Sequence, residues 1–246
     1  MSGLRRALAS PESKAPYVRG LFHTIADRYD LITRLLSYGQ DSRWKRRLAS
    51  MSAASPGARA LDLASGTGDI AFALAARGAR VVALDITHRM LQLAQAKAER
   101  RDVTFVTADM MALPFSPGAF DLVTTGYGIR NVPRIEPALG EIRRVLKPGG
   151  VLLSLDFDRP VNPAMRAIYL GYLTITGSAL GWVLHRDPDT YRYIPESIRR
   201  YPGSAGVAAM LAREGFEDCR VVPLLGGLMA INTARRREIP STDGSL

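Results

Sequence analysis

Cysteine and histidine are scarce in this chain of 246 residues. Cys219 is the only cysteine, which excludes a disulfide framework and fits a reducing compartment. His23, His88 and His185 are the only histidines, and none of them stands at a spacing typical of metal ligands. The sequence therefore predicts no disulfide and no metal site.

The chain also has fewer acidic than basic residues. The chain carries 33 Lys and Arg against 23 Asp and Glu, a net charge of +10, which would suit an anionic partner. Nearly all of the positive residues are arginine, however, and they are spread along the chain, as genome composition alone can produce. The clusters at 43–47 and 235–237 are interpreted as a solvated helix face and a basic tail. We expect no nucleic-acid partner, and the sequence leaves open a peripheral membrane contact and a homodimer.

No long apolar run opens the chain. Arg5 and Arg6 are followed by a mixed polar stretch, so no secretory signal is expected. We therefore expect a cytoplasmic protein. One uncharged run, residues 167–184, is longer but contains three glycines, two threonines and a serine. A membrane-spanning helix needs about 20 predominantly apolar residues. We therefore predict that this run forms buried helices, either as ordinary core or as the lining of an apolar ligand site.

The spacing of apolar residues divides the chain into segments of different kinds. Residues 1–16 show no periodicity and are expected to form a flexible leader, whereas 17–50 show helical spacing and predict an N-terminal helical cap. From residue 58 onward, short apolar runs alternate with helical patterns, which is typical of a parallel sheet with helices on both faces. Two strand-like runs on either side of Gly226 and Gly227 predict a closing antiparallel hairpin.

These segments predict one α/β domain over residues 17–235. The expected architecture is a Rossmann-like fold, with a mostly parallel sheet of seven strands that ends in the antiparallel hairpin. Residues 160–200 interrupt the alternation and are expected to form a helical insertion on the acceptor side of the site, and 236–246 a flexible tail.

A glycine-rich turn follows the first predicted strand. The sequence from Asp62 to Asp69 reads DLASGTGD and leads directly into a helical pattern. Gly66 and Gly68, on either side of Thr67, allow the backbone to bend sharply and to approach a ligand closely. The turn is therefore predicted to bind a cofactor, although an isolated glycine loop does not identify one.

Acidic and glycine residues end the strands that follow. Asp85 ends the second strand, 17 residues after the turn, where a carboxylate can accept hydrogen bonds from both hydroxyls of a ribose. Asp109 and Met110 end the third strand, and Gly126 ends the fourth. Because ligands of open α/β sheets bind outside the carboxyl ends of the strands, these residues are expected to meet in one crevice.

Two classes of enzyme fit this crevice. The residues from Gly66 to Ala71 also satisfy the G-x-G-x-x-A fingerprint of an NAD-dependent dehydrogenase. However, Asp62 and Asp69 would repel a pyrophosphate and attract the cationic amino end of S-adenosylmethionine. Asp109 has no role in the dehydrogenase fingerprint, and no Tyr-x-x-x-Lys pair occurs in the chain. We therefore predict an S-adenosylmethionine-dependent methyltransferase.

Six short segments besides the cofactor turn resemble those of one enzyme family. They are FHTIADRYD at 22–30, LSYG at 36–39, WK at 44–45, GIRNV at 128–132, YRYIPESI at 191–198 and GGLMAI at 226–231. Over residues 20 to 234 the chain resembles the UbiE/MenG family of C-methyltransferases of ubiquinone and menaquinone biosynthesis.

The resemblance implies a reaction and a set of contacts. It implies C-methylation of a polyprenylated quinol precursor, either demethylmenaquinol or the 2-methoxy-6-polyprenyl-benzoquinol of the ubiquinone path. It also implies contacts to S-adenosylmethionine at Thr67, Asp85, Asp109, Met110 and Gly126. The chain departs from the family pattern at Met110 and Gly126, where alanine and serine are common, but the backbone of each can still make the contact. It also has Asn232 where a histidine is common in the hairpin, which leaves any acceptor contact of that histidine in doubt.

Polar residues of the resembling segments are the candidates for the acceptor side. Arg130 is the predicted anchor that stabilises a developing phenolate, with Asn131 supporting it, although a structural role of Arg130 is an equal alternative. Tyr29, Asp30 and Tyr193 are candidate acceptor contacts.

Three other functions are compatible with parts of the sequence. Another small phenolic or lipid acceptor would share every cofactor residue, so it stays open. A nucleic-acid methyltransferase is disfavoured, because the fourth strand is followed by Gly126-Tyr127-Gly128 and lacks the Asn/Asp-Pro-Pro-aromatic element of amino-methylating enzymes. A non-catalytic cofactor-binding subunit also stays open, although it would leave Arg130 and Asn131 without a purpose.

Overall fold

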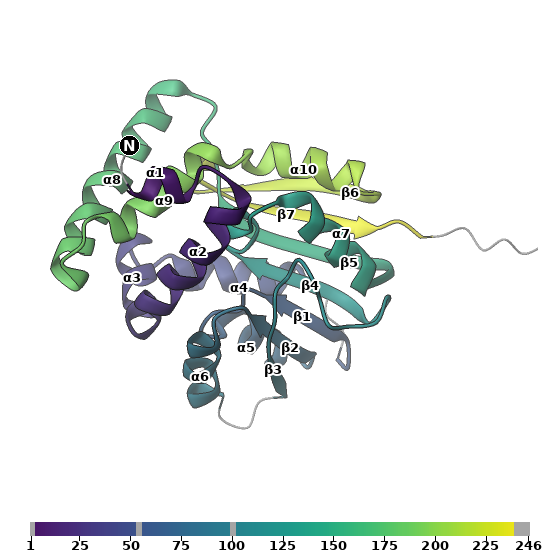
Figure 1. The fold of residues 1–246 in the computed structure, drawn as a ribbon. Coiled ribbons are helices and arrows are strands. Elements are labelled where there is room, and N and C mark those ends of the chain that lie inside the picture. The colour runs from purple at the N-terminus through teal and green to yellow at the C-terminus, as the bar shows by residue number, and fades with distance from the viewer. Residues whose placement is uncertain (1–2, 53–55, 99–101, 239–246) are drawn as a thin grey trace, which may run out of the picture.

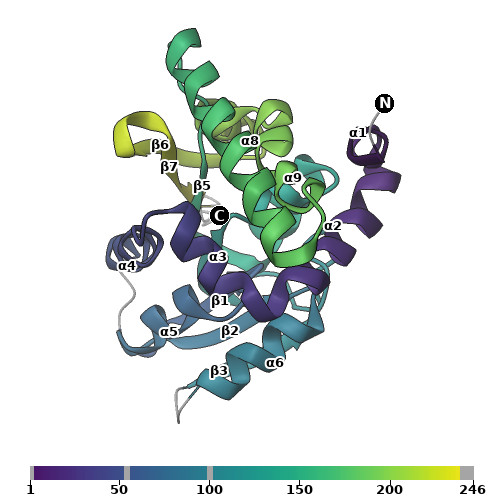
Figure 2. The ribbon, with the colours of Figure 1, turned by 90° about the vertical axis from the view of Figure 1, so that its left-hand side faces the viewer.

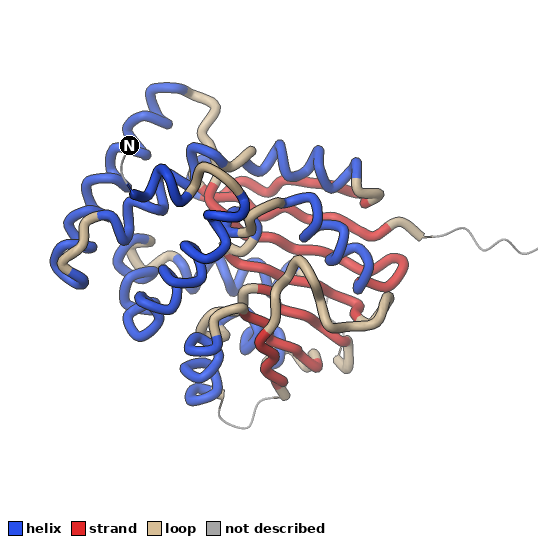
Figure 3. Tube along the Cα trace, in the orientation of Figure 1, coloured by secondary structure: helices blue, strands red, loops and turns tan. Residues whose placement is uncertain are grey.

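One mixed sheet with helices on both faces makes up most of the residues that the computed structural model describes, 3–52, 56–98 and 102–238 (Figures 1 and 3). The strands are β1 (Arg59–Leu63), β2 (Arg80–Asp85), β3 (Val103–Thr107), β4 (Phe120–Gly126), β5 (Leu146–Phe157), β6 (Phe216–Leu224) and β7 (Met229–Arg236). Their order in the sheet is β3-β2-β1-β4-β5-β7-β6. The first five strands pair in parallel, and β7 lies antiparallel to β5 and β6, as the sequence predicts.

Helices bury both faces of the sheet. On one face, α4 (Asp41–Met51) and α5 (Asp69–Ala75) pack against apolar residues of the central strands. On the other face, α7 (Ile135–Val145) and α10 (Gly203–Arg213) contribute to a second apolar cluster. Near the edge of the sheet, α6 (His88–Lys97) contacts β2 and β3. Strands covered on both faces read as continuous apolar runs, which explains why they could be recognised in the sequence.

The N-terminal segment differs from the expected flexible leader over 1–16. Ser10 accepts a hydrogen bond from the backbone of Ser13 and so caps a helix that begins at Pro11. Leu4 and Leu8 are buried, because they lie one helical turn apart and pack in one cluster with Val18 and Tyr193. The helices of this segment are α1 (Gly3–Ala7), α2 (Pro11–Ile25) and α3 (Tyr29–Leu36), with a 3₁₀ turn at Ala26–Arg28 between the last two.

The uncharged run 167–184 is part of a single long helix, and the expectation that it is buried is wrong. The helical insertion consists of α8 (Pro163–His185) and α9 (Asp189–Arg200). Only Leu173, Gly177 and Gly181 of α8 are buried. A Cβ at Gly181 would lie 2.5 Å from the backbone of the segment that joins the helices, so glycine is what lets α9 approach α8. The other residues of α8 are half-buried or exposed, and Ile168, Tyr169 and Tyr172 line an apolar cavity, which agrees with the alternative that the run lines a ligand site.

Among the described residues, α8 is the one helix that is long and apolar enough to cross a bilayer by length and composition. Its most apolar 18-residue window has a mean hydropathy of 1.4, and 17% of that window is buried. Figures 1 and 2 show α2, α3, α8 and α9 gathered at one end of the sheet. This end holds the cavities described next.

Candidate active site

A cavity of about 100 Å³ lies at the carboxyl ends of the parallel strands. The predicted cofactor residues Gly66, Asp85, Asp109, Met110 and Gly126 all line it. The structure thus brings together residues from the ends of four strands, as the topology predicts. The predicted residues Asp62, Thr67 and Gly68 are outside this lining.

Asp85 organises the floor of the cofactor cavity. Its Oδ2 accepts a hydrogen bond from the backbone N–H of Gly66 (2.8 Å), and its Oδ1 accepts one from that of Thr87 (2.8 Å). Burial raises the pKa of Asp85, while these backbone donors act in the opposite direction. Each carboxylate oxygen keeps a second lone pair, so Asp85 can still accept hydrogen bonds from ribose hydroxyls.

The remainder of the lining suits an adenosine-bearing cofactor. Leu84, Ile86 and Met90 add apolar surface beside the Asp85 carboxylate, which fits a base next to a ribose. A Cβ at Gly126 would lie 2.7 Å from Cδ1 of Ile70 in α5, so a larger residue here would require the end of that side chain to shift.

Asp62, Thr67 and Gly68 shape the turn from behind. Asp62 is fully buried and its Oδ1 accepts a hydrogen bond from Thr124 Oγ1 (2.7 Å). Thr67 donates a hydrogen bond from Oγ1 to Asp30 Oδ1 (2.6 Å). Gly68 has a φ of 91°, which residues other than glycine rarely adopt. These residues therefore fix the course of the cofactor turn.

The buried carboxyl group of Asp62 is expected to make the free energy of unfolding depend on pH. Burial raises its pKa to about 7, against the lowering effects of Thr124 and the Ala71 backbone. The unfolded state therefore binds fewer protons than the folded state between about pH 4 and pH 7, and the free energy of unfolding falls as the pH rises through this range. We expect Asp62→Asn to unfold at a higher temperature than the wild type at about pH 8, by roughly 2–8 °C, and the difference to shrink toward pH 4. Thermal unfolding without cofactor measures this, and a difference independent of pH would contradict it.

A second cavity of about 320 Å³ adjoins the first. Its walls come mainly from α2, α3, α8 and α9, and most of its lining side chains are apolar or aromatic. Four residues line both cavities: Phe22, Tyr29, Tyr127 and Asn131. A group transferred from a bound cofactor to a ligand in the second cavity has to pass at this junction.

Arg130 borders the second cavity and is held by a buried ion pair. It lies in the 3₁₀ turn Ile129–Asn131, its Nε donates to Asp156 Oδ1 (3.1 Å), and its Nη1 donates to Ser197. Burial opposes the charged form, but Asp156, Tyr193 and Tyr201 together outweigh it and raise the pKa of Arg130. The Arg130 guanidinium thus ties its turn to the Asp156 carboxylate, and Arg130 also lines the second cavity.

The other predicted acceptor-side residues divide into two groups. Asn131 accepts a hydrogen bond from Tyr193 Oη (2.8 Å) and donates to the Tyr127 carbonyl (2.6 Å), so these residues form one network in the wall of the second cavity. Tyr29 lies at the junction. Asp30 lies outside both linings and is bonded to Thr67 and to Lys97, so it joins α3 to the cofactor turn and to α6.

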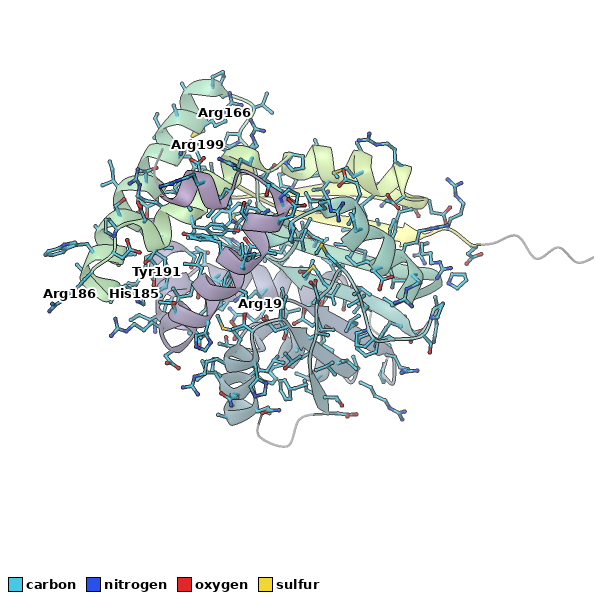
Figure 4. The ribbon with its side chains drawn as sticks, viewed as in Figure 1. Arg19, Arg166, His185, Arg186, Tyr191 and Arg199 are labelled. Atoms are coloured by element: carbon cyan, nitrogen blue, oxygen red, sulfur yellow. The ribbon has the colours of Figure 1, made fainter. Side chains whose placement is uncertain are left out.

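Several residues of the site were missed in the sequence. α2 closes the cofactor cavity with Arg19 among its lining residues (Figure 4), and Lys14 Nζ donates to the carbonyls of Arg130 (3.0 Å) and Val132 (2.6 Å). The basic cluster interpreted as a solvated helix face includes the buried Lys45. The available signal was the i, i+4 spacing of an acid and a base at its start, Asp41 and Lys45.

Residues 10–236 match the model of the ubiE/COQ5 methyltransferase family. The chain belongs to this family. It is 44% identical to the demethylmenaquinone methyltransferase of Thermus thermophilus, over 88% of this chain and all of that protein. It is 36% identical to a ubiquinone/menaquinone biosynthesis C-methyltransferase UbiE of Shewanella, over 90% of this chain and 91% of that protein.

Solved structures of low identity share the fold. The chain is similar to an S-adenosylmethionine-dependent methyltransferase of Thermotoga maritima, with a TM-score of 0.66 and 17% identity over 89% of this chain and all of that one. The predicted family, fold and enzyme class are confirmed, and this member of the ubiE/COQ5 family is an S-adenosylmethionine-dependent methyltransferase. The dehydrogenase alternative is thereby excluded.

Proposed function

We propose that this methyltransferase transfers a methyl group to a ring carbon of a reduced, lipid-tailed quinol, with demethylmenaquinol as the first acceptor and the ubiquinone-path quinol as the second. The observation that carries the proposal is the large apolar cavity that adjoins the cofactor cavity at Tyr29 and Tyr127. The two relatives given above support it, since the name of one refers to demethylmenaquinone and that of the other to C-methylation in ubiquinone and menaquinone biosynthesis.

The residues of the junction have to position the acceptor. S-adenosylmethionine, when bound, supplies the methyl group as a sulfonium. Transfer requires a ring carbon of the quinol to lie in line with that methyl group, and such positioning can lower the barrier by about 7–11 kcal/mol. The aromatic rings of Phe22, Tyr29 and Tyr127 provide flat apolar walls for a quinol ring. Arg130, held charged by Asp156, is the proposed partner for the negative charge that develops on a hydroxyl oxygen.

The acceptor assay tests this function. Labelled S-adenosylmethionine is incubated with reduced short-tailed demethylmenaquinol, and in parallel with the ubiquinone-path quinol, a soluble phenol and RNA. We expect label in at least one lipid-tailed quinol and none in RNA. Label only in the soluble phenol would favour the other small-molecule acceptor class and would reject the quinol proposal.

The outer face of α8 supports delivery of the acceptor from a membrane surface. Ile168, Ile175 and Trp182 lie seven residues apart, so they share one face of the helix, and 66–72% of each side chain is exposed. Arg166 and Arg186 lie near the two ends of the helix (Figure 4), and α8 contains no acidic residue. An apolar stripe flanked by arginines is typical of a helix that lies in the interface of an anionic bilayer.

The acceptor cavity reaches the surface beside α8 at Tyr38, which lines the cavity and is exposed. Tyr38 stacks on Tyr172 of α8 with 5.9 Å between ring centroids, and both residues line the cavity. Leu31 and Leu35 of α3 are about half exposed. We therefore propose that the polyprenyl tail leaves the cavity between α3 and α8 and enters the bilayer there.

Binding to vesicles tests the membrane contact. Changing Ile175 and Trp182 together to aspartate removes two apolar side chains, each worth about 1.5–3 kcal/mol when buried, and adds repulsion from anionic lipid. We expect at least about tenfold less co-sedimentation with anionic vesicles, and unchanged methylation of an acceptor with a short soluble tail. Val221→Asp, at an exposed position of β6, is the control. Equal co-sedimentation of all three proteins would reject the membrane contact.

A further inference from the structure

One charged side chain at the acceptor cavity has no part in the function proposed above. Asp41 is the first residue of α4, is 6% exposed, and lines the acceptor cavity. A buried carboxylate beside an apolar cavity is costly, because the charge is removed from water. Such a group in a cleft is a candidate for a role in catalysis.

Asp41 is held in place by two donors. Tyr127 Oη donates a hydrogen bond to Asp41 Oδ1 (2.6 Å), and Lys45 Nζ lies 2.6 Å from Asp41 Oδ2. Lys45 also donates to Asp69 Oδ2 (2.9 Å). Although burial favours the neutral amine, Tyr29, Asp41 and Asp69 raise the pKa of Lys45, so the ammonium stays charged. These two contacts fix the position of the Asp41 side chain in the wall of the acceptor cavity.

Tyr127 connects Asp41 to the junction of the two cavities. Its side chain lines both cavities, and its backbone has a φ of 61°, a conformation that costs energy for a residue other than glycine. Strained residues of this kind persist where the surrounding structure imposes them and are concentrated at functional sites. The strained turn after β4 thus places Tyr127 both at the junction of the two cavities and within hydrogen-bond distance of the Asp41 carboxylate.

Stability alone gives a poor account of this arrangement. Lys45 would retain Asp69 as a partner without Asp41, and Asp69 is partly exposed and so less costly to charge. Replacing a buried ion pair with apolar residues is often neutral or stabilising. The Asp41 carboxylate is therefore better explained by a ligand that donates a hydrogen bond to it.

We propose that Asp41 is the proton acceptor for a hydroxyl group of the quinol, with Tyr127 and Lys45 as positioning residues. The proposal rests on the proposed function. As the ring carbon bonds to the methyl group, the S–C bond breaks and its electron pair stays on sulfur. The O–H bond of the quinol breaks, its proton passes to Asp41, and its electron pair forms a C=O bond. The ring then loses its C–H proton to solvent while Asp41 returns a proton to the oxygen, so that one proton is released overall.

The test uses acceptors of different acidity. Asp41→Asn keeps the size of the side chain and an oxygen for Tyr127, but it cannot take the proton. We expect kcat for demethylmenaquinol to fall by about 10²–10⁴-fold, with the Kd for S-adenosylmethionine unchanged within about threefold. For analogues with electron-withdrawing ring substituents, whose hydroxyl ionises more readily, the deficit should shrink, because less help from a base is needed. A merely structural role would lower kcat equally for every acceptor.

Two further variants keep the test decisive. Asp121→Asn, at the end of β4 opposite the cavities and paired with Lys147, is the matched control and should behave as the wild type. If Asp41→Asn does not fold, Tyr127→Phe carries the test, with a fall in kcat of about tenfold that also shrinks with acceptor acidity. A wild-type kcat in Asp41→Asn, or a deficit independent of acidity, would overturn the proposal while the function stands. A wild-type protein that methylates no quinol would reject the function and this proposal together.

Discussion

Replacing Arg130 with alanine is expected to lower the free energy of unfolding by about 3–5 kcal/mol and to abolish measurable methyl transfer. The stability loss follows because Asp156 is only 3% exposed and would be left as a buried charge without its guanidinium partner. For a chain of this size the unfolding midpoint should fall by roughly 6–20 °C. The activity loss follows because Arg130 faces the acceptor cavity with the positive charge proposed for the phenolate. Calorimetry and the labelled-methyl assay measure the two effects.

A double variant separates these two roles of Arg130. Changing Arg130 to methionine and Asp156 to leucine replaces the buried pair with apolar side chains of similar volume, which is often neutral for stability. We expect the midpoint to return close to that of the wild type, and the activity to stay absent. Recovery of activity in the double variant would show that Arg130 is only a structural fork and would remove it from the proposed chemistry.

Replacing Asp85 with alanine is expected to weaken binding of S-adenosylmethionine by about 10²–10⁴-fold. The variant loses the proposed hydrogen bonds to the two ribose hydroxyls, and it also loses the bonds that hold the backbone of Gly66 and Thr87 in place. A hydrogen bond to a charged group contributes about 1.5–3 kcal/mol, so the loss of the two bonds to the ribose gives a change in affinity of this size. Titration calorimetry with S-adenosylmethionine gives the Kd directly.

The control for Asp85 is a carboxylate that also accepts a backbone hydrogen bond but lies away from the cavities. Asp121 accepts one from the N–H of Arg59 (2.9 Å) and pairs with Lys147 at the surface. Asp121→Ala should bind the cofactor as the wild type does. If both alanine variants lost affinity to the same extent, the effect at Asp85 would be one of general stability, and its assignment to the cofactor site would fail.

The cofactor half of the site was predictable because its signals are local. Gly66, Asp85, Asp109 and Gly126 each stand at the end of an apolar run, and parallel topology brings such ends together. The directions of the Asp62 and Thr67 side chains were harder to predict from the sequence, because a residue in the right motif can face the cavity or the protein beneath it. The sequence gives the motif, and packing decides the direction.

The acceptor half depended on contacts between distant segments. Asp41 lies 86 residues from Tyr127, and nothing in the local pattern pairs them. For α8 the alternative of a ligand-site lining agrees with the structure, but its exposure was not predictable, because an uncharged run fits both a buried helix and a helix that covers a cavity with one face and leaves the other exposed. The leader was misjudged because Leu4 and Leu8 are too few to show a periodicity, although Ser10 before Pro11 is a helix-start signal.

The position of the transferred methyl group tests the account most directly. The protein is supplied with labelled S-adenosylmethionine and with demethylmenaquinol either kept reduced or oxidised beforehand, and the product is analysed by nuclear magnetic resonance. The account predicts a methyl group on a ring carbon and transfer to the reduced form alone, because only the quinol has a hydroxyl that can make the ring nucleophilic. A methyl group on oxygen, or equal transfer to the oxidised quinone, would contradict it.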